Sequence, residues 1–315
     1  MIDRNEVKIV FMGTPEFAKK SLQKLVENSY NVVACFTNQD KPSGRGMKLK
    51  MSPVKEYAML NNIELYQPQR LKNNEDIINI LKDINPDIIV VVAYGKILPK
   101  QILDIPKYGC INVHGSLLPE YRGAAPIQWA LIDGKKVTGI TTMFMDEGMD
   151  TGDMLLKKEV EILDSDNCDT MFEKMSIVGA DLLLDTLDKV LDGSIRRIKQ
   201  PEKGSVAPQI TREMTKLDFS KNALDLVNLI RGVGNLGTYM EDEDGIRYKV
   251  YGAKINDEEV CGSIGQIVIQ DKKHLGIKCF DKVLEITQIQ APNSKKMDIV
   301  SFLAGNKLNN TKKFI

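Results

Sequence analysis

The stretch Val7-Lys8-Ile9-Val10-Phe11-Met12-Gly13 decides the fold class, because it opens a strand–helix–strand unit. Residues 7–12 form a run of strand length that is apolar apart from Lys8 and predict a buried strand. Thr14 then suits a helix N-cap and Pro15 the first helical position, and apolar residues recur behind them at helical spacing. Residues 31–37 predict a second strand. This order indicates a βαβ unit and therefore a parallel sheet.

The turn after the first strand lacks the phosphate-binding pattern of dinucleotide enzymes. That pattern, G-x-G-x-x-G, places three glycines where the backbone meets a pyrophosphate. Here Gly13 stands alone. The sequence therefore disfavours a dinucleotide site, although it predicts a Rossmann-like sheet.

The amino-acid composition is that of a globular protein. The 315 residues carry no formal net charge, and 43% hydrophobic and 27% charged residues are typical of a globular protein. No apolar run reaches the roughly 18–20 residues of a membrane span, and the polar N-terminus is not a signal peptide. The five scattered cysteines favour free thiols in a reducing cytoplasm and give no support to a zinc site.

A second strand end carries the candidate chemistry. Asn112 and His114 stand two apart in the apolar run 110–114, so their side chains point to the same face. Gly115 ends the strand and opens a loop. An amide donor beside an imidazole suits a reaction in which a carbonyl oxygen becomes an oxyanion while an attacking nitrogen loses a proton.

A carboxylate could complete this pair. Residues 146–153 hold four acids, but the calcium-loop spacing of an EF-hand is absent. One carboxylate that reaches into the crevice could orient His114 or take a proton through water. Asp150 and Asp153 are both candidates, and spacing alone does not choose between them.

Two loops are candidate ligand contacts. Tyr94 and Gly95 follow the apolar strand 87–93, and open α/β sheets bind ligands at that carboxyl edge, so we expect both residues to line a pocket. Residues 38–55 predict a long basic loop. It is either a solvated loop or a segment that follows a nucleic-acid backbone.

The C-terminal part differs from the rest in its predicted secondary structure. Residues 192–208 have the character of a linker. Beyond a helix at 220–231, short strands at 247–255, 265–269, 274–279 and 283–289 without helices between them predict a small β-barrel. His274 lies among lysines and is expected on the surface.

Several of these stretches carry a family resemblance over most of the chain. They are Phe11–Phe17, Lys41–Gly46, Val91–Gly95, Asn112–Pro119, Tyr121–Gln128 and Met145–Asp153. The run Asn-x-His-x-Ser-Leu-Leu-Pro with a later Asp resembles the folate-dependent formyltransferases. With the basic loop and the C-terminal strands, the sequence resembles the methionyl-tRNA formyltransferase family. One departure is Gly234–Tyr239, where that family commonly has an Asn-Pro-Trp-Pro-type run.

The resemblance implies a fold and an activity. The fold is a Rossmann-like formyltransferase domain at 1–191, a linker at 192–208 and an OB-like β-barrel at 209–315 that contacts tRNA. The reaction moves the formyl group of 10-formyltetrahydrofolate to the α-amino group of methionyl initiator tRNA. The family is typically monomeric, and it requires no metal or covalent intermediate.

It also implies roles for residues. Asn112 and His114 would donate to the oxyanion, and the match to the family's catalytic aspartate selects Asp150 over Asp153. Further implied contacts are Ser116, Leu117, Leu118, Pro119, Tyr94 and Gly95 for folate, and Arg45, Lys41 and Lys48 for tRNA.

Three other functions are open to such a sequence. A formyltransferase acting on glycinamide ribonucleotide or an amino sugar would leave the basic loop without a purpose. A formyltetrahydrofolate hydrolase needs no tRNA-binding tail. A tRNA-binding protein with an inactive enzyme domain has no need of Asn112, His114 and Asp150 together.

Overall fold

The computed structural model describes residues 4–43, 48–306, 308 and 313–315, and the chain divides into two compact units. The N-terminal unit comprises Met1–Pro126, Val137–Glu161 and Phe172–Ala207. The C-terminal unit comprises Ile127–Lys136, Ile162–Met171 and Pro208–Ile315. Two short segments from the first 191 residues thus group with the C-terminal unit, while the contiguous boundaries 1–191, 192–208 and 209–315 remain a prediction.

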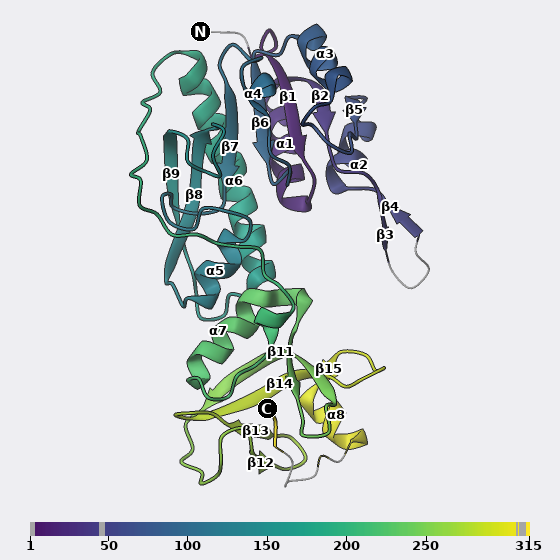
Figure 1. Cartoon of the computed structure of the whole chain (residues 1–315), viewed down its shortest axis with the longest axis vertical. Helices are drawn as coiled ribbons and strands as arrows, with labels where there is room; N and C mark the ends of the chain where they lie inside the picture. Colours follow the sequence, from purple (N-terminus) through teal and green to yellow (C-terminus); the bar gives the residue numbers. More distant parts are fainter. Residues whose placement is uncertain (1–3, 44–47, 307, 309–312) are drawn as a thin grey trace. The chain divides into compact units, whose positions relative to one another are not determined.

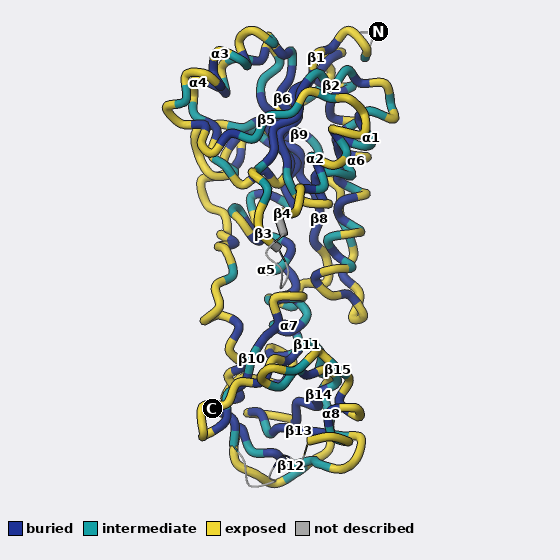
Figure 2. Tube along the Cα trace, turned by 90° about the vertical axis from the view of Figure 1, so that its right-hand side faces the viewer, coloured by how far each residue is buried: buried dark blue, intermediate teal, exposed yellow. Residues whose placement is uncertain are grey.

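A seven-stranded sheet forms the centre of the N-terminal unit, in the order β5-β2-β1-β6-β7-β8-β9 (Figure 1). The first five strands are parallel, which confirms the α/β class, whereas β8 pairs antiparallel with both β7 and β9. Figure 2 shows strands of this sheet in the dark blue of buried residues. The strands are β1 (Lys8–Gly13), β2 (Asn31–Phe36), β5 (Glu64–Tyr66), β6 (Ile88–Val92), β7 (Cys110–His114), β8 (Val137–Phe144) and β9 (Met154–Glu161).

Helices cover both faces of this sheet. Apolar residues of α3 (Glu75–Ile84) and α4 (Lys100–Leu103) share a buried cluster with Val10, Val91 and Cys110 of the strands. On the opposite face lies α6 (Cys168–Leu191), where Gly179 packs closely on Val113. Alternate residues of β7 therefore face different helices, which decides where its polar side chains point.

Helix α1 (Glu16–Glu27) begins differently from the sequence prediction. Pro15, not Thr14, occupies the N-cap, and no side chain caps the helix. The Thr14 hydroxyl instead accepts hydrogen bonds from the Asn38 backbone N–H at 3.3 Å and from its side-chain amide at 3.1 Å. A long-range partner has thus replaced the local cap.

The predicted basic loop contains a hairpin, so the loop prediction was wrong in part. Strands β3 (Lys41–Ser43) and β4 (Lys48–Lys50) pair antiparallel, and α2 (Pro53–Leu60) follows. Asp40, before the hairpin, accepts from Lys55 Nζ at 2.7 Å and from Gln67 Nε2 at 2.9 Å. These bonds hold the pKa of Asp40 below its usual range. Strands of three residues are too short to show an alternating pattern in sequence.

The C-terminal unit is built on an antiparallel sheet in the order β10-β11-β14-β13-β12, with β15 beside β14. Strands β11 to β14 match the four predicted ranges to within two residues at each end. The elements are α5 (Pro126–Ile132), α7 (Ala223–Val233), β10 (Thr238–Glu241), β11 (Arg247–Asn256), β12 (Ile267–Gln270), β13 (Leu275–Lys278), β14 (Val283–Gln290), β15 (Met297–Asp298) and α8 (Ile299–Gly305), with short 3₁₀ turns at Glu213–Thr215 and Gly234–Leu236.

The end of the chain links the two edges of this sheet. The Phe314 N–H donates to Gly265 O, just before β12, and the Ile315 N–H donates to Glu241 O of β10, both at 2.8 Å. Phe314 is buried against Phe219 and Tyr248. Partnering both edges in this way makes the sheet barrel-like and protects edges that would otherwise pair with other chains.

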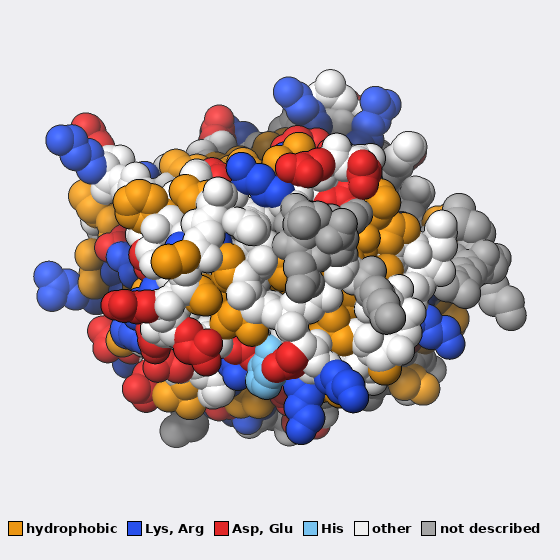
Figure 3. Space-filling model, turned by 90° about the horizontal axis from the view of Figure 1, so that it is seen from below, with side chains coloured by type: hydrophobic (Ala, Val, Ile, Leu, Met, Phe, Trp, Pro, Cys, Tyr) orange, Lys and Arg blue, Asp and Glu red, His pale blue; other side chains and the backbone are white. Residues whose placement is uncertain are grey.

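Charges of both signs are mixed on the face seen from below in Figure 3. Blue Lys and Arg side chains lie among red Asp and Glu side chains and orange apolar ones. This face matches a chain with equal numbers of acidic and basic residues.

Candidate active site

The end of β7 presents two polar side chains on one face of the sheet. Asn112 and His114 alternate with Val113, whose side chain faces α6. They lie on the same face as Cys110, which belongs to the cluster with α3 and α4. Their shared direction, predicted from the two-residue spacing, is the one that the structure has.

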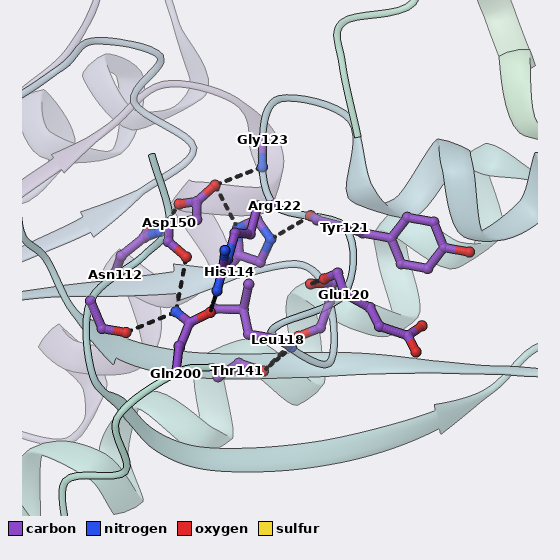
Figure 4. Close-up of polar contacts among 12 residues, drawn as sticks. Asn112, His114, Leu118, Glu120, Tyr121, Arg122, Gly123, Thr141, Asp150 and Gln200 are labelled. Atoms are coloured by element: carbon purple, nitrogen blue, oxygen red, sulfur yellow. Dashed lines mark hydrogen bonds and ion pairs between the residues drawn. The ribbon is translucent and has the colours of Figure 1, made fainter. Parts of the chain in front are cut away.

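Asp150 joins this pair from the loop after β8 (Figure 4). Its Oδ1 accepts from Asn112 Nδ2 at 3.4 Å, and its Oδ2 lies 3.5 Å from His114 Nδ1. The Gly123 N–H donates to Oδ2 at 2.8 Å. The first two distances are longer than the third. One carboxylate thus contacts both the amide and the imidazole.

Hydrogen bonding sets the orientation of the His114 ring. The side chain is 5% exposed, and Nε2 lies 2.9 Å from the Tyr121 carbonyl oxygen. A carbonyl can only accept, which assigns the ring hydrogen to Nε2. Nδ1 is therefore the atom that faces Asp150 and the one that can take or release a proton toward it.

The shape of the 146–152 loop explains several of its residues. Asp146 Oδ1 accepts from the Gly148 N–H at 3.0 Å and the Thr151 hydroxyl at 2.8 Å, so this acid folds the loop. A Cβ on Gly152 would lie 1.8 Å from the Phe144 carbonyl oxygen, which only glycine avoids. Asp150 itself has a φ of 54°, in the left-handed region that non-glycine residues rarely adopt.

Asp153, the other candidate acid, has a different contact. Its backbone carbonyl accepts from the Phe144 N–H at 2.9 Å, extending the pairing of β8 with β9. The carboxylate with hydrogen bonds to Asn112 and the Gly123 N–H is that of Asp150. The structure therefore brings Asn112, His114 and Asp150 together.

Two further residues touch the site that sequence reasoning did not assign to it. Gln200 donates from Nε2 to the carbonyls of Asp150 and Gly152 at 2.9 and 2.8 Å. Its Oε1 accepts from Arg122, at 3.1 Å from Nε and 2.9 Å from the terminal nitrogen. Arg122 stood in a quoted motif, but Gln200 lies in the predicted linker and no local pattern marks it.

The Ser116–Pro119 segment is folded tightly behind the site. The Ser116 hydroxyl donates to Glu120 O at 2.6 Å, and Thr141 Oγ1 accepts from the Leu118 N–H at 3.1 Å. Ser116 and Leu118 are fully buried, while Leu117 and Pro119 are partly exposed. A ligand at this segment would therefore meet Leu117 and Pro119 first.

Tyr94 and Gly95 follow β6, next to β7. The Tyr94 side chain is 1% exposed and belongs to the apolar cluster beneath α3 and α4. Burial raises the pKa of its phenol, and within the described part of the chain its hydroxyl has no hydrogen-bond partner. Its backbone carbonyl accepts from Asn38 Nδ2 at 2.9 Å. A Cβ on Gly95 would meet nothing within 4 Å, so this turn is open.

The three candidate tRNA-binding residues belong to the basic segment. Lys41 is exposed on β3. Lys48 begins β4, and its side chain is outside the described residues, as is the whole of Arg45. The structure therefore places the hairpin and leaves the contacts of these cations a prediction.

The described residues form neither a cluster of metal ligands nor a membrane-spanning helix. Among the described residues, no three His, Cys, Asp or Glu side chains gather closely enough to hold a metal ion. Within the same ranges, no helix has the length and apolar character needed to cross a membrane. All five cysteines are free, four of them buried and Cys261 exposed.

Comparison with known families covers most of the chain. A family model described as formyl transferase matches residues 7–187, and one described as formyl transferase, C-terminal domain, matches residues 209–307. A methionyl-tRNA formyltransferase of Clostridioides difficile is 46% identical over 301 residues, which are 95% of this chain and 97% of that one. The enzyme of the same name from Caldanaerobacter subterraneus is 46% identical over 96% of this chain and 98% of its own.

Solved structures share the fold at lower identity. HypX from Aquifex aeolicus superposes with a TM-score of 0.65 at 15% identity, over 95% of this chain and 49% of that one. WlaRD, a sugar 3N-formyl transferase determined with dTDP and 5-N-formyl-THF, gives a TM-score of 0.64 at 18% identity, over 92% and 99% of the two chains. At this identity the likeness concerns the fold.

Proposed function

The chain belongs to the methionyl-tRNA formyltransferase family, and from that premise we propose that Asn112, His114 and Asp150 catalyse its reaction. The reaction transfers the formyl group of 10-formyltetrahydrofolate to the α-amino group of methionyl initiator tRNA. The observation that carries the proposal is the Asp150 carboxylate, which lies beside both the Asn112 amide and the His114 ring. The relatives' names favour this function over a small-molecule acceptor or a hydrolase.

In the first step the free α-amine attacks the formyl carbon. The carbonyl electron pair moves to oxygen and gives a tetrahedral oxyanion. Asn112 Nδ2 donates to this oxygen, and the His114 ring, protonated at Nδ1 beside Asp150, supplies positive charge to it. Asp150 fixes the orientation and protonation of the ring from 3.5 Å.

In the second step the intermediate collapses. The attacking nitrogen gives up its extra proton to the Asp150 carboxylate through water. The oxyanion reforms the carbonyl, and the bond from the formyl carbon to N10 of the folate breaks. N10 takes the proton, so one proton in total moves from the amine to the folate.

The remaining site residues have proposed binding roles. Ser116, Leu117, Leu118 and Pro119, with Tyr94 and Gly95, line the folate side; Leu117 and Pro119 offer partly exposed side chains, and Tyr94 offers its backbone. Arg45, Lys41 and Lys48 contact tRNA from the basic segment, and the barrel-like domain at 209–315 contacts it as well. The match to a formyl transferase C-terminal domain supports the second assignment.

We also propose that the protein works as a monomer in the cytoplasm. Its five free thiols suit a reducing compartment, and both of its substrates would be met there. The site residues contact one another within a single chain.

The role of Asn112 is tested by Asn112→Ala. We expect the single-turnover rate of formyl transfer to fall about 10²–10³-fold, the usual cost of removing one oxyanion donor. Dissociation constants for folate and for tRNA should stay within about twofold, because the donor acts when charge develops. Asn61→Ala, on the exposed end of α2, is the matched control. Weaker tRNA binding with an unchanged rate would contradict the role.

The role of the basic segment is tested by Arg45→Ala. A charge-assisted hydrogen bond is worth about 1.5–3 kcal/mol, so the Kd for tRNA should rise roughly ten- to a hundredfold. The slope of log Kd against log salt should fall by about one, while folate binding is unchanged. Arg70→Ala, at an exposed arginine of the N-terminal unit, should have no such effect. Unchanged tRNA binding and salt dependence would make the segment a solvated hairpin.

A further inference from the structure

The side chain of Gln200 is buried with every hydrogen-bonding position used. Only 8% of the residue is exposed. Its Nε2 donates to two carbonyls of the catalytic loop, those of Asp150 and Gly152, and its Oε1 accepts two bonds from Arg122. An amide has two donors and two acceptor lone pairs, so all four are satisfied. Such a fully connected amide has one allowed orientation.

The loop needs this support because of its backbone. Asp150 has a φ of 54°, and a non-glycine residue holds such a conformation only when its surroundings over-determine it. Gln200 bonds the carbonyl of Asp150 and the one two residues later, which fixes the intervening peptide planes. The orientation of the Asp150 carboxylate toward His114 follows from that backbone.

The segment that begins with Gln200 also contacts Tyr121, whose carbonyl is the second hydrogen-bond partner of His114. We call residues 200–207 the strap. The Tyr121 N–H donates to Ser205 Oγ at 2.8 Å, and Tyr121 O is the acceptor for His114 Nε2. The Arg122 N–H donates to Ser205 O at 2.9 Å, and its carbonyl accepts from the Ala207 N–H at 2.7 Å. The strap therefore fixes the acceptor on one side of the imidazole and the carboxylate on the other (Figure 4).

We propose that Gln200 and Arg122 are positioning residues for formyl transfer, which hold the backbone of the catalytic loop so that the Asp150 carboxylate faces Nδ1 of His114. The inference rests on the proposed catalytic role of Asp150. It assigns to the predicted linker a part in the chemistry. It also explains why the residue is an amide: a carboxylate could accept from Arg122 but could not donate to the two loop carbonyls.

The test replaces Gln200 with residues of similar size. Gln200→Met removes all four bonds, and Gln200→Glu keeps only those from Arg122. We expect the single-turnover rate at saturating substrates to fall about 10–100-fold in both, because a displacement of about 1 Å can cost 10²-fold. The Kd values for tRNA and for folate should stay within about twofold. Equal loss in rate and binding, or an unchanged rate, would overturn the proposal.

A stability control separates positioning from general loosening. Thr186 on α6 is fully buried and bonds Thr142 and the Leu182 carbonyl, away from the site. Thr186→Val should lower the melting temperature and leave the rate unchanged. If Gln200→Met fails to fold, Arg122→Lys takes its place, since it keeps the charge and loses the planar fork that binds Oε1. A wild-type rate in that variant would contradict the proposal.

A double variant distinguishes this inference from the proposed function. If Gln200 acts through Asp150, Gln200→Met added to Asp150→Asn should lower the rate by less than about threefold further. If the fold-losses in rate of the two single variants multiplied in the double variant, Gln200 would not act through Asp150. That result would overturn the positioning role and leave Asp150 catalytic. A wild-type rate in Asp150→Asn alone would overturn the catalytic role first, and the inference with it.

Discussion

Replacing His114 with alanine should lower the single-turnover rate of formyl transfer by about 10²–10⁴-fold. The ring is held between the Tyr121 carbonyl at 2.9 Å and the Asp150 carboxylate at 3.5 Å. In the proposed mechanism, alanine removes both the imidazole that stabilises the oxyanion and the partner of Asp150. The rate is measured by rapid quench with both substrates saturating.

The chain supplies a matched control in its second histidine. The His274 Nδ1–H donates to Glu285 Oε1 at 2.8 Å in the C-terminal unit. His274→Ala should leave the transfer rate within about twofold of wild type. His114→Ala should also leave the Kd for tRNA nearly unchanged. If rate and tRNA binding fell together, His114 would be a structural residue.

Asp150→Asn should have an effect of similar size, about 10²–10⁴-fold on the rate. The asparagine can still accept from the Gly123 N–H, so the loop keeps that 2.8 Å bond. It cannot take a proton, and its neutral amide cannot stabilise a protonated His114 ring. The loss should therefore appear in the rate of the chemical step rather than in substrate affinity.

Asp153→Asn is the matched control, because it removes the other candidate carboxylate of the same loop. Both acids stand in the same loop, and the sequence alone left the choice between them open. Asp153 accepts from the Phe144 N–H through its backbone carbonyl, so substitution of its side chain should change the rate less than about threefold. A slow Asp153→Asn beside a normal Asp150→Asn would reverse the assignment.

The sheet and half of the site follow from local patterns in the sequence. The βαβ unit at 7–37 predicted the parallel sheet, and the two-residue spacing of Asn112 and His114 predicted their common face. Both depend on periodicity, which the backbone imposes directly. Asp150 was distinguished from Asp153 by the family resemblance, because a loop has no period from which to read direction.

The rest depends on contacts between distant residues. Gln200 meets Asp150 across fifty positions of sequence, and a lone glutamine in a linker gives no local signal. Thr14 was predicted to cap a helix but bonds Asn38 instead. The hairpin at 41–50 is made of strands too short to show alternation. In each case tertiary partners override a weak local preference.

The central claim is that His114 and Asp150 act as one catalytic unit on the formyl group. The most direct test is the single-turnover rate of formyl transfer from 10-formyltetrahydrofolate to methionyl initiator tRNA in His114→Ala, Asp150→Asn and the double variant. The account predicts that the double variant is about as slow as Asp150→Asn alone, because His114 acts only in the orientation that Asp150 gives it. Losses that multiply would mean that the two side chains act independently, and would contradict it.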